Sequence, residues 1–450
     1  MQKILIANRG EIASRIIKTC KQLNIQTVAV YSDADQDMPF VKEADVAYRI
    51  GESQVNRSYL VVENILDVAK KEKVDGIHPG YGLLSENAAF AKAVTEAGIT
   101  FIGPAHDIID KMGDKVEARK VMQEASVPVV PGSEGGVGTI DAAKEVALAI
   151  GYPVMLKASG GGGGIGMIRC ENEQALVQSF DSTKNRAKAY FGKEEVFLEK
   201  CIENARHIEV QIFGDQHGNL VHLFERNCSV QRRNQKVIEE SPSPDLSHET
   251  KERMFAAAVQ AGKAVGYTNA GTVEFIVDEE ENFYFLEMNT RLQVEHPVTE
   301  TITGLDLVKW QLLVADGKPL PLCKQEEILH HGHAIEFRIY AEDPKTFYPS
   351  PGQLNVLKWG EGEGVRIDSG YEEGNKVTPF YDPMISKCII KGRDRNDALH
   401  KAKVFFDGVS IEGVKTNVTL FKDIIEDNGF IEGTYTTKWL QDFLTAKRTH

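Results

Sequence analysis

The segment 287–297, EMNTRLQVEHP, carries the densest set of side chains able to do chemistry in this chain. Side chains of a strand alternate between its two faces. As a strand, the segment places five polar residues on one face, namely Glu287, Asn289, Arg291, Gln293 and Glu295. The other face is mostly apolar, so an ordinary sheet with one solvated face is the competing interpretation.

Two neighbouring sites follow from these residue types. Glu274, in the run TVEFIVD, can face the same side as Glu287 and Asn289, and their oxygens suit Mg²⁺ bound beside phosphates. Arg291 offers a planar fork of donors for a small oxyanion, and Glu295 is placed to act as a general base. A metal–phosphate site next to an oxyanion site predicts the activation of an acid by ATP.

A run of five glycines interrupts the stretch KASGGGGGIGM at 157–167 and joins two β-type segments. Glycine has no Cβ, so its backbone N–H groups can approach a polyphosphate closely. Lys157 adds an ammonium group for a phosphate contact. A mobile linker remains open as an alternative on these residues alone. The run is followed neither by a Gly-Lys-Ser/Thr motif nor by a helix, which excludes a Walker A loop and a dinucleotide fingerprint.

Two further segments are candidates for a nucleotide site. The run EVFLEKCI at 195–202 has the form of a strand whose backbone pairs with an adenine, while Glu199 and Lys200 offer polar ends. An ordinary strand is the alternative. The run QRRNQK at 231–236 is a basic cluster in an acidic chain, and a solvated surface loop explains it equally well.

Three single residues stay ambiguous. His207, in RHIEV, is a core histidine or a ligand. Tyr81, in the turn HPGYG, has a structural or a binding role. Arg338 lies in the apolar β-type run HAIEFRIYA, where an arginine needs a partner, so a buried ion pair is the simplest interpretation.

The pattern of elements predicts an α/β part followed by α+β parts. Up to about residue 112, strands alternate with amphipathic helices, which is typical of a doubly wound parallel sheet. The middle of the chain contains two hairpins, EVQIFGD with GNLVHLFER and TVEFIVD with NFYFLEMN, separated by a helix at about 247–265. From about residue 330, short β-type runs precede two helices near 395–407 and 416–427.

Composition limits the class of protein. The chain has 450 residues, 42% of them hydrophobic, and a formal net charge of −14. This acidic balance disfavours binding to nucleic acid or to an anionic membrane. The six cysteines show no C-x-x-C spacing and read as reduced thiols, and no apolar run is long enough to span a bilayer. We therefore expect a cytoplasmic protein of two to four domains.

Together these motifs resemble biotin carboxylase. The motifs that carry the resemblance are, in chain order, IANRGEIA (6–13), HPGYGLLSEN (78–87), FIGP (101–104), MGDK (112–115), KASGGGGGIGM (157–167), ERNCSVQRRNQK (225–236), EMNTRLQVEHPVTE (287–300) and PSPG (349–352). The match runs in order to about residue 440. The hairpin motif and the QRR-x-QK spacing separate biotin carboxylases from other ATP-grasp enzymes.

The resemblance implies an ATP-grasp fold of three parts: a doubly wound pre-ATP-grasp α/β domain at 1–112, an ATP-grasp domain at 113–330 with a mobile lid at about 130–203, and a C-terminal α+β domain at 331–450. It implies a ligase that uses ATP and bicarbonate to carboxylate biotin on a biotin carboxyl carrier protein through carboxyphosphate. This is the first half-reaction of an acyl-CoA carboxylase, such as the acetyl-CoA carboxylase of fatty acid biosynthesis.

The resemblance also assigns roles to single residues. The implied ATP contacts are Lys115, Lys157, Gly163, Gly164, Glu199, Lys200, Cys201, Ile202, His207, Asn234, Glu274 and Glu287. Two Mg²⁺ ions, or Mn²⁺, are implied on Glu274, Glu287 and Asn289. Bicarbonate is implied on Lys236, Arg291, Gln293 and the backbone N–H of Val294. Glu295 is the implied base, Arg338 meets the ureido oxygen of biotin, and Tyr81 borders the biotin pocket.

The chain departs from the family pattern at three positions. The lid position after the glycines is usually basic and is Ile165 here. Asn234 replaces the histidine of QRRHQK that touches the nucleotide, and Asn227 replaces an aspartate. We expect an active enzyme whose contact with ATP is weakened or altered.

The partners follow from what the sequence lacks. None of the nine methionines is followed by Lys, so the biotin-accepting sequence Ala-Met-Lys-Met does not occur. We expect biotin to arrive as a substrate on a separate carrier protein, with carboxyltransferase subunits and a homodimeric arrangement. Three alternatives are another ATP-grasp ligase joining a carboxylate to an amine, a catalytically decayed ATP-binding assembly protein, and a nicotinamide oxidoreductase. The last lacks a G-x-G-x-x-G run after the first strand.

Overall fold

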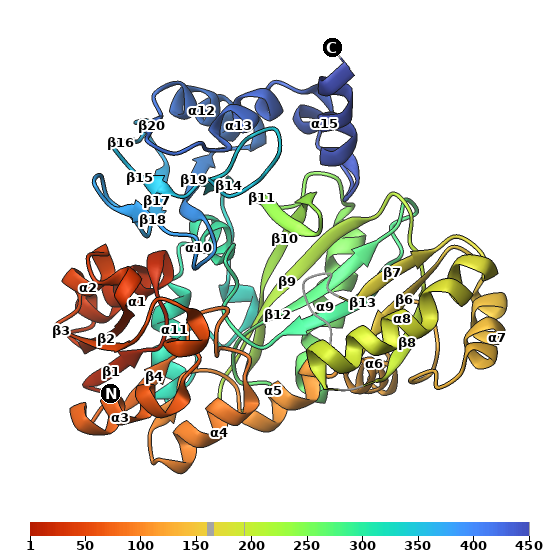
Figure 1. Cartoon of the computed structure of the whole chain (residues 1–450), viewed down its shortest axis with the longest axis horizontal. Coiled ribbons are helices and arrows are strands. Elements are labelled where there is room, and N and C mark those ends of the chain that lie inside the picture. Colours follow the sequence, from red (N-terminus) through yellow and green to blue (C-terminus); the bar gives the residue numbers. More distant parts are fainter. Residues whose placement is uncertain (160–165, 193, 450) are drawn as a thin grey trace.

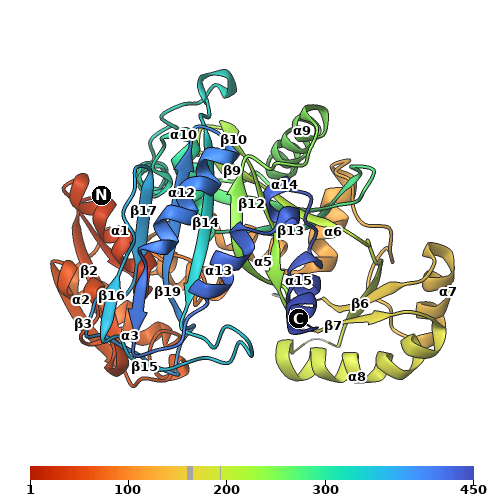
Figure 2. The same cartoon turned by 90° about the horizontal axis from the view of Figure 1, so that it is seen from above.

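The computed structural model describes residues 1–159, 166–192 and 194–449. Figures 1 and 2 show three groups of elements along the longest axis of the molecule, with the start of the chain at one end. A large central sheet fills the middle, and a small sheet with two helices lies at the other end. The candidate site residues come from all three groups.

The first group is a five-stranded parallel sheet with the strand order β3-β2-β1-β4-β5. Its strands are β1 Lys3–Ile6, β2 Gln26–Ser32, β3 Val46–Gly51, β4 Gly76–His78 and β5 Thr100–Phe101. Its helices are α1 Gly10–Gln22, α2 Pro39–Glu43, α3 Val62–Glu72, α4 Ala88–Glu96 and α5 His106–Gly113. The doubly wound α/β prediction is confirmed.

The central sheet has eight strands in the order β13-β12-β9-β10-β11-β14-β19-β17. Their bounds are β9 Arg206–Gly214, β10 Leu220–Arg232, β11 Gln235–Ser241, β12 Asn269–Val277, β13 Phe283–Asn289, β14 His333–Tyr340, β17 Val365–Ser369 and β19 Met384–Gly392. Both predicted hairpins, β9 with β10 and β12 with β13, are present. Because β11 pairs with β14, one sheet continues from the middle of the chain into its last part. The domain boundaries near 112 and 330 stay predictions.

Helices pack around this central sheet. They are α6 Lys115–Glu124, α9 His248–Ala264, α10 His296–Thr303, α11 Leu307–Ala315, α12 Arg395–Asp407, α13 Val418–Ile425, α14 Asn428–Glu432 and α15 Trp439–Thr449. The last part of the chain also contains short strands outside the central sheet, namely β15 Gly352–Gln353, β16 Val356–Lys358, β18 Lys376–Val377 and β20 Ser410–Glu412.

The third group is a three-stranded sheet in the order β7-β6-β8. Its elements are α7 Ile140–Ile150, β6 Val154–Ala158, β7 Met167–Cys170, α8 Glu173–Phe191 and β8 Val196–Lys200. Strands β6 and β7 pair antiparallel and bracket the glycine run, as predicted. The positions of Gly163, Gly164 and Ile165 lie outside the described residues.

One sequence prediction is wrong. The segment 287–295 is not a continuous strand, because β13 ends at Asn289 and a loop leads to α10. Pro297 occupies the first turn of α10, where its missing N–H costs nothing and its fixed φ suits a helix start. Glu295 is therefore the N-cap residue of a helix, and strand alternation does not orient Arg291, Gln293 or Glu295.

No helix in the described ranges is long and apolar enough to cross a membrane. All six cysteines are free thiols, as expected.

Candidate functional site

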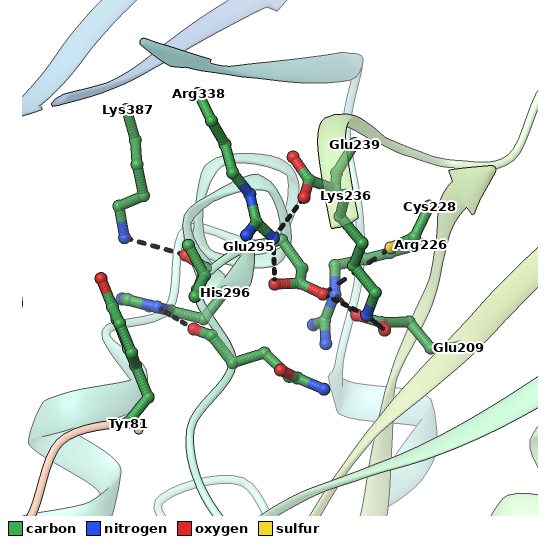
Figure 3. A network of polar contacts seen from close by, with 12 residues as sticks. Tyr81, Glu209, Arg226, Cys228, Lys236, Glu239, Glu295, His296, Arg338 and Lys387 are labelled. Atoms are coloured by element: carbon green, nitrogen blue, oxygen red, sulfur yellow. Dashed lines mark hydrogen bonds and ion pairs between the residues drawn. The ribbon is translucent and has the colours of Figure 1, made fainter. Parts of the chain in front are cut away.

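The centre of the site is the ammonium group of Lys236 on β11. Its Nζ lies 2.6 Å from a carboxylate oxygen of Glu209, 2.6 Å from one of Glu295 and 2.9 Å from one of Glu274. The three carboxylates come from β9, the loop before α10 and β12. Figure 3 shows Lys236 reaching towards Glu209 and Glu295. Burial disfavours the charge, but Glu209, Glu274 and Glu295 together raise the pKa of Lys236 well above its usual value.

Glu295 is held between two cations. Its Oε1 faces Lys236, and its Oε2 accepts a hydrogen bond of 2.9 Å from Nη2 of Arg338 on β14. Arg338 also pairs with Glu239 of β11 (Figure 3). Burial acts to raise the pKa of Glu295, but Lys236 and Arg338 lower it well below its usual range. The predicted base is therefore a carboxylate, and the predicted buried ion pair of Arg338 is present.

Glu274 ties the oxyanion residues to the predicted metal site. Its Oε1 accepts hydrogen bonds from Nδ2 of Asn289 at 2.9 Å and from Nε2 of Gln293 at 3.0 Å. Its Oε2 lies 3.1 Å from Nε2 of His207. Burial opposes its ionisation, but Lys236 and His207 lower the pKa of Glu274. His207 is thus buried and beside the site at the same time.

Arg291 lies at the edge of this cluster. Its Nη1 donates to the side-chain oxygen of Gln293 at 2.7 Å, and its Nη2 donates to that of Asn289 at 3.0 Å. Its Nε donates to Glu86 at 2.8 Å. The loop therefore brings together the residues that strand alternation was expected to align, through side-chain contacts that the sequence pattern does not contain.

The residues predicted to bind Mg²⁺ fit that role chemically. Glu274 and Glu287 face each other across the β12–β13 pair, and Asn289 follows on the same strand face as Glu287. All three offer oxygen ligands, as Mg²⁺ prefers beside phosphates. The two carboxylates contact Lys236 and Lys115, the latter 3.1 Å from Glu287, so cations already balance the charge there.

A second cluster lies on the small sheet. Lys157 of β6 pairs with Glu199 of β8, whose other oxygen accepts a hydrogen bond of 3.0 Å from Arg119. Lys157 and Glu199 are both buried. The two predicted ATP contacts are therefore brought together on the small sheet.

Other predicted ATP contacts have local partners. The ammonium group of Lys200 donates to the carbonyl oxygen of Gly151 at 3.0 Å, away from Glu199. The backbone N–H of Cys201 donates to the carbonyl of Pro153 at 3.0 Å, and Ile202 follows in the chain. These bonds do not bring Lys200, Cys201 and Ile202 to the Lys236 cluster.

Asn234 and Tyr81 lie in turns, and Asn227 lies on β10. Asn234 is exposed at the tip of the β10–β11 turn, where it and Arg233 have φ of 66° and 50°. Asparagine tolerates this left-handed conformation well. Asn227 is buried and donates to Oγ of Ser243 at 3.2 Å. The hydroxyl of Tyr81 donates to Glu11 of α1.

The sequence interpretation missed a set of buried charged residues. They are Glu11, Glu209, Arg226, Glu239, Glu336 and Lys387. Arg226 is fully buried, and its Nε lies 2.5 Å from Glu209. A charged residue in an apolar strand was the signal that identified Arg338. The same signal is present in HIEVQIF for Glu209 and in HAIEF for Glu336.

Three family models match the chain. The model described as "Biotin carboxylase, N-terminal domain" matches residues 1–109. The model "Carbamoyl-phosphate synthase L chain, ATP binding domain" matches residues 114–323, and "Biotin carboxylase C-terminal domain" matches residues 336–442.

Curated relatives and solved structures agree with these models. Biotin carboxylase 2 of Bacillus subtilis is 58% identical over 98% of this chain and 99% of its own length. Biotin carboxylase of Halalkalibacterium halodurans is 54% identical over 99% and 98%. The structure of a biotin carboxylase–beta-gamma-ATP complex from Campylobacter jejuni superposes with a TM-score of 0.96 at 45% identity, covering 98% of both chains. The biotin carboxylase domain dimer of Hydrogenobacter thermophilus 2-oxoglutarate carboxylase, in complex with MgADP, ADP and bicarbonate, gives a TM-score of 0.94 at 47% identity, covering 98% and 97%.

Proposed function

Since this chain belongs to the biotin carboxylase family and is an ATP-dependent ligase that carboxylates biotin, we propose that the Lys236 cluster is its bicarbonate and biotin site. The observation that carries this proposal is the single ammonium group shared by Glu209, Glu274 and Glu295. It links the predicted base to a predicted metal ligand in one buried network. The MgADP and bicarbonate of the Hydrogenobacter thermophilus structure support the same ligands here.

Bicarbonate binds Lys236, the guanidinium of Arg291, the amide of Gln293 and the backbone N–H of Val294. These groups are hydrogen-bond donors, and two of them are cations, as an anion requires. Arg291 and Gln293 already contact each other at 2.7 Å, so the binding groups are held together before the anion arrives. Glu295 then accepts the proton of bicarbonate, whose oxygen attacks the γ-phosphate of ATP and gives ADP and carboxyphosphate.

The base is activated by a change of partners. Lys236 and Arg338 hold the pKa of Glu295 low, which makes it a carboxylate but a weak base. When Lys236 turns to bicarbonate and Arg338 to the ureido oxygen of biotin, the pKa of Glu295 rises towards its usual value. Proton transfer from bicarbonate is then more favourable than in the free enzyme.

Lys115 and Lys157 hold the ATP phosphates, together with the glycine run that contains Gly163 and Gly164. Glu199, Lys200, Cys201, Ile202, His207 and Asn234 complete the nucleotide site. Glu274, Glu287 and Asn289 hold Mg²⁺ or Mn²⁺, which offsets the negative charge of the phosphates when it is bound.

Carboxyphosphate breaks down to CO₂ and phosphate, and the phosphate takes the N1′ proton of biotin. Arg338 stabilises the resulting enolate, which captures CO₂, while Tyr81 borders the pocket. The lid excludes water, to which carboxyphosphate would otherwise be lost.

The partners and the cellular location are part of the proposal. Relatives of this chain include one component of a pyruvate carboxylase and the small subunit of a 2-oxoglutarate carboxylase, and a related domain is described as a dimer. We therefore propose that this chain is a cytoplasmic homodimer that acts with a biotin carboxyl carrier protein and carboxyltransferase subunits. We also propose that its domains divide near residues 112 and 330.

The experiment that tests the site is ADP release from MgATP with and without bicarbonate, with free biotin added at high concentration. The wild type is expected to need bicarbonate and to respond to biotin. An Arg291→Ala variant is expected to raise the KM for bicarbonate by about tenfold or more, because a charge-assisted hydrogen bond is lost. An unchanged bicarbonate KM in this variant would contradict the proposed site.

A further inference from the structure

Lys387 of β19 is a fully buried cation outside the proposed binding groups. Its side chain has no exposed surface. Its Nζ donates to the carbonyl oxygen of Val294 at 2.8 Å and lies 3.0 Å from Oε1 of Glu11. Figure 3 shows Lys387 reaching down from its strand towards the loop that carries Glu295, with Tyr81 below it. A buried lysine is costly unless it is paired, so a specific role for this position is worth testing.

The loop before α10 is held by its carbonyl groups. The carbonyl of Gln293 accepts a hydrogen bond of 2.7 Å from Nδ1 of His296, and that of Val294 accepts from Lys387. Because a carbonyl only accepts, Nδ1 of His296 carries the proton. Burial and the nearby Lys387 lower the pKa of His296 well below its usual value, so this ring is neutral. Two side chains from different elements thus fix two successive peptide groups.

These peptide groups carry the proposed chemistry. The peptide from Gln293 to Val294 supplies the N–H proposed for bicarbonate, and the peptide from Val294 to Glu295 leads into the base. Each peptide unit is planar. A hydrogen bond to the Val294 carbonyl therefore sets the rotation of the backbone between the anion-binding N–H and the Glu295 side chain.

The other partner of Lys387 connects this loop to the first part of the chain. Glu11 lies in the first turn of α1 and accepts a hydrogen bond from the hydroxyl of Tyr81. Burial raises the pKa of Glu11, and Lys387 lowers it. Tyr81, Glu11, Lys387 and Val294 thus form one chain of contacts from the proposed biotin pocket to the bicarbonate loop.

We propose that Lys387 is a positioning residue for bicarbonate: it fixes the peptide between Val294 and Glu295 so that the N–H of Val294 and the carboxylate of Glu295 face the same anion. The proposal rests on the bicarbonate site proposed above. Lys387 itself touches no substrate. Its hydrogen-bond and ion-pair partners are Val294 and Glu11, so its loss is expected to leave the ATP-binding residues proposed on β6, β8 and β12 in place.

Two variants test this role, Lys387→Met and the double variant Glu11→Gln with Lys387→Met. The single variant leaves Glu11 buried without its cation, and this is expected to lower the melting temperature. The double variant removes both charges, so it is expected to recover stability. Both lack the donor to Val294. We expect both to raise the KM for bicarbonate by about tenfold or more, with the KM for ATP changed by less than about twofold.

Arg395→Met is the matched control. Arg395 is a part-buried cation that also pairs with a buried glutamate, Glu240, and also donates to backbone carbonyls, those of Phe430 and Ile431. The Arg395→Met variant is expected to have a lower melting temperature than the wild type and an unchanged KM for bicarbonate. A double variant that recovers both stability and the wild-type bicarbonate KM would overturn the proposal, because Lys387 would then be merely structural.

The Arg291→Ala variant separates this inference from the proposed site. If Arg291→Ala raises the bicarbonate KM and both Lys387 variants leave it unchanged, the site stands and the positioning role is wrong. If none of the three variants changes the bicarbonate KM, the bicarbonate site itself is misplaced and the positioning role falls with it.

Discussion

Glu239 and Glu240 are neighbours on β11 whose side chains point to opposite faces of the sheet. Both are fully buried. Glu239 lies opposite Glu336 and pairs with Arg338. Glu240 contacts His333 at 2.5 Å and Arg395 at 2.7 Å. We predict that removing one charge at each position, with Glu239→Gln and Glu240→Gln, changes stability in opposite directions at alkaline pH.

The magnitudes follow from the pKa shifts. Burial, together with Glu295, raises the pKa of Glu239 from 4.5 to about 7, against the effect of Arg338. Between these values the folded protein keeps a proton that the unfolded chain has released, so its free energy of unfolding falls by about 3 kcal/mol as pH rises through this window. The Glu239→Gln variant lacks this loss of unfolding free energy, because glutamine has no proton to release in this pH range.

Glu240 shows the opposite shift. Burial opposes its ionisation, but His333 and Arg395 lower its pKa from 4.5 to about 2. Its contribution of about 3 kcal/mol is therefore fully present above pH 4.5 and is lost as pH falls towards 2. Glu240→Gln is expected to lose about this much stability at neutral pH, and the loss stays the same at alkaline pH.

The assay is thermal unfolding of the wild type and both variants at pH 5.5, 7.0 and 8.5. Relative to the wild type, Glu239→Gln is expected to gain stability mainly between pH 5.5 and pH 7.0 and to level off by pH 8.5, while Glu240→Gln stays equally destabilised. Above about pH 7, where Glu239 is ionised, Glu239→Gln is also expected to lower carboxylation activity by about tenfold, because Arg338 loses a charged partner. A Glu239→Gln variant that is equally destabilised at pH 5.5 and pH 8.5 would refute the reasoning.

Three further predictions concern the nucleotide and the metal. Glu274→Gln is expected to raise the Mg²⁺ concentration needed for half-maximal ADP release by more than about tenfold, and an unchanged Mg²⁺ dependence would exclude Glu274 as a ligand. Lys157→Met is expected to raise the KM for ATP far more than Lys200→Met, since Lys200 bonds the carbonyl of Gly151; equal effects would contradict this. Asn234→His is expected to lower the KM for ATP, and an unchanged value would show that this position does not weaken the nucleotide contact.

Much of the fold follows from periodicity and turn residues. The parallel sheet, both hairpins, and the helices at His248–Ala264 and Arg395–Asp407 agree with the sequence pattern. The 19-residue helix α8 was not expected, although Asn172 caps its start by accepting from the N–H of Ala175. The continuity of β11 with β14 was also not predictable, because strand partners far apart in the chain leave no local pattern.

At the site, too, some features follow from the local sequence and others do not. Residue type and spacing predicted Glu274, Glu287, Arg291 and Glu295 as site residues, although the strand assumed for Arg291 and Glu295 ends at Asn289. Residue type alone cannot show which charges share one buried space, so Lys387 and its contact with Val294 were missed. Lys387 lies on β19, Val294 in the loop before α10 and Glu11 on α1, and these segments meet only in the folded chain.

The measurement that tests the central claim most directly follows oxygen-18 from labelled bicarbonate into phosphate. If Glu295 activates bicarbonate to attack ATP, the attacking oxygen stays on phosphorus when carboxyphosphate breaks down. We predict one labelled oxygen in each phosphate from the wild type. We also predict that Glu295→Gln forms labelled phosphate more than about 100-fold more slowly, as expected for loss of a general base. Unlabelled phosphate from the wild type, formed only with oxygen from water, would contradict the account.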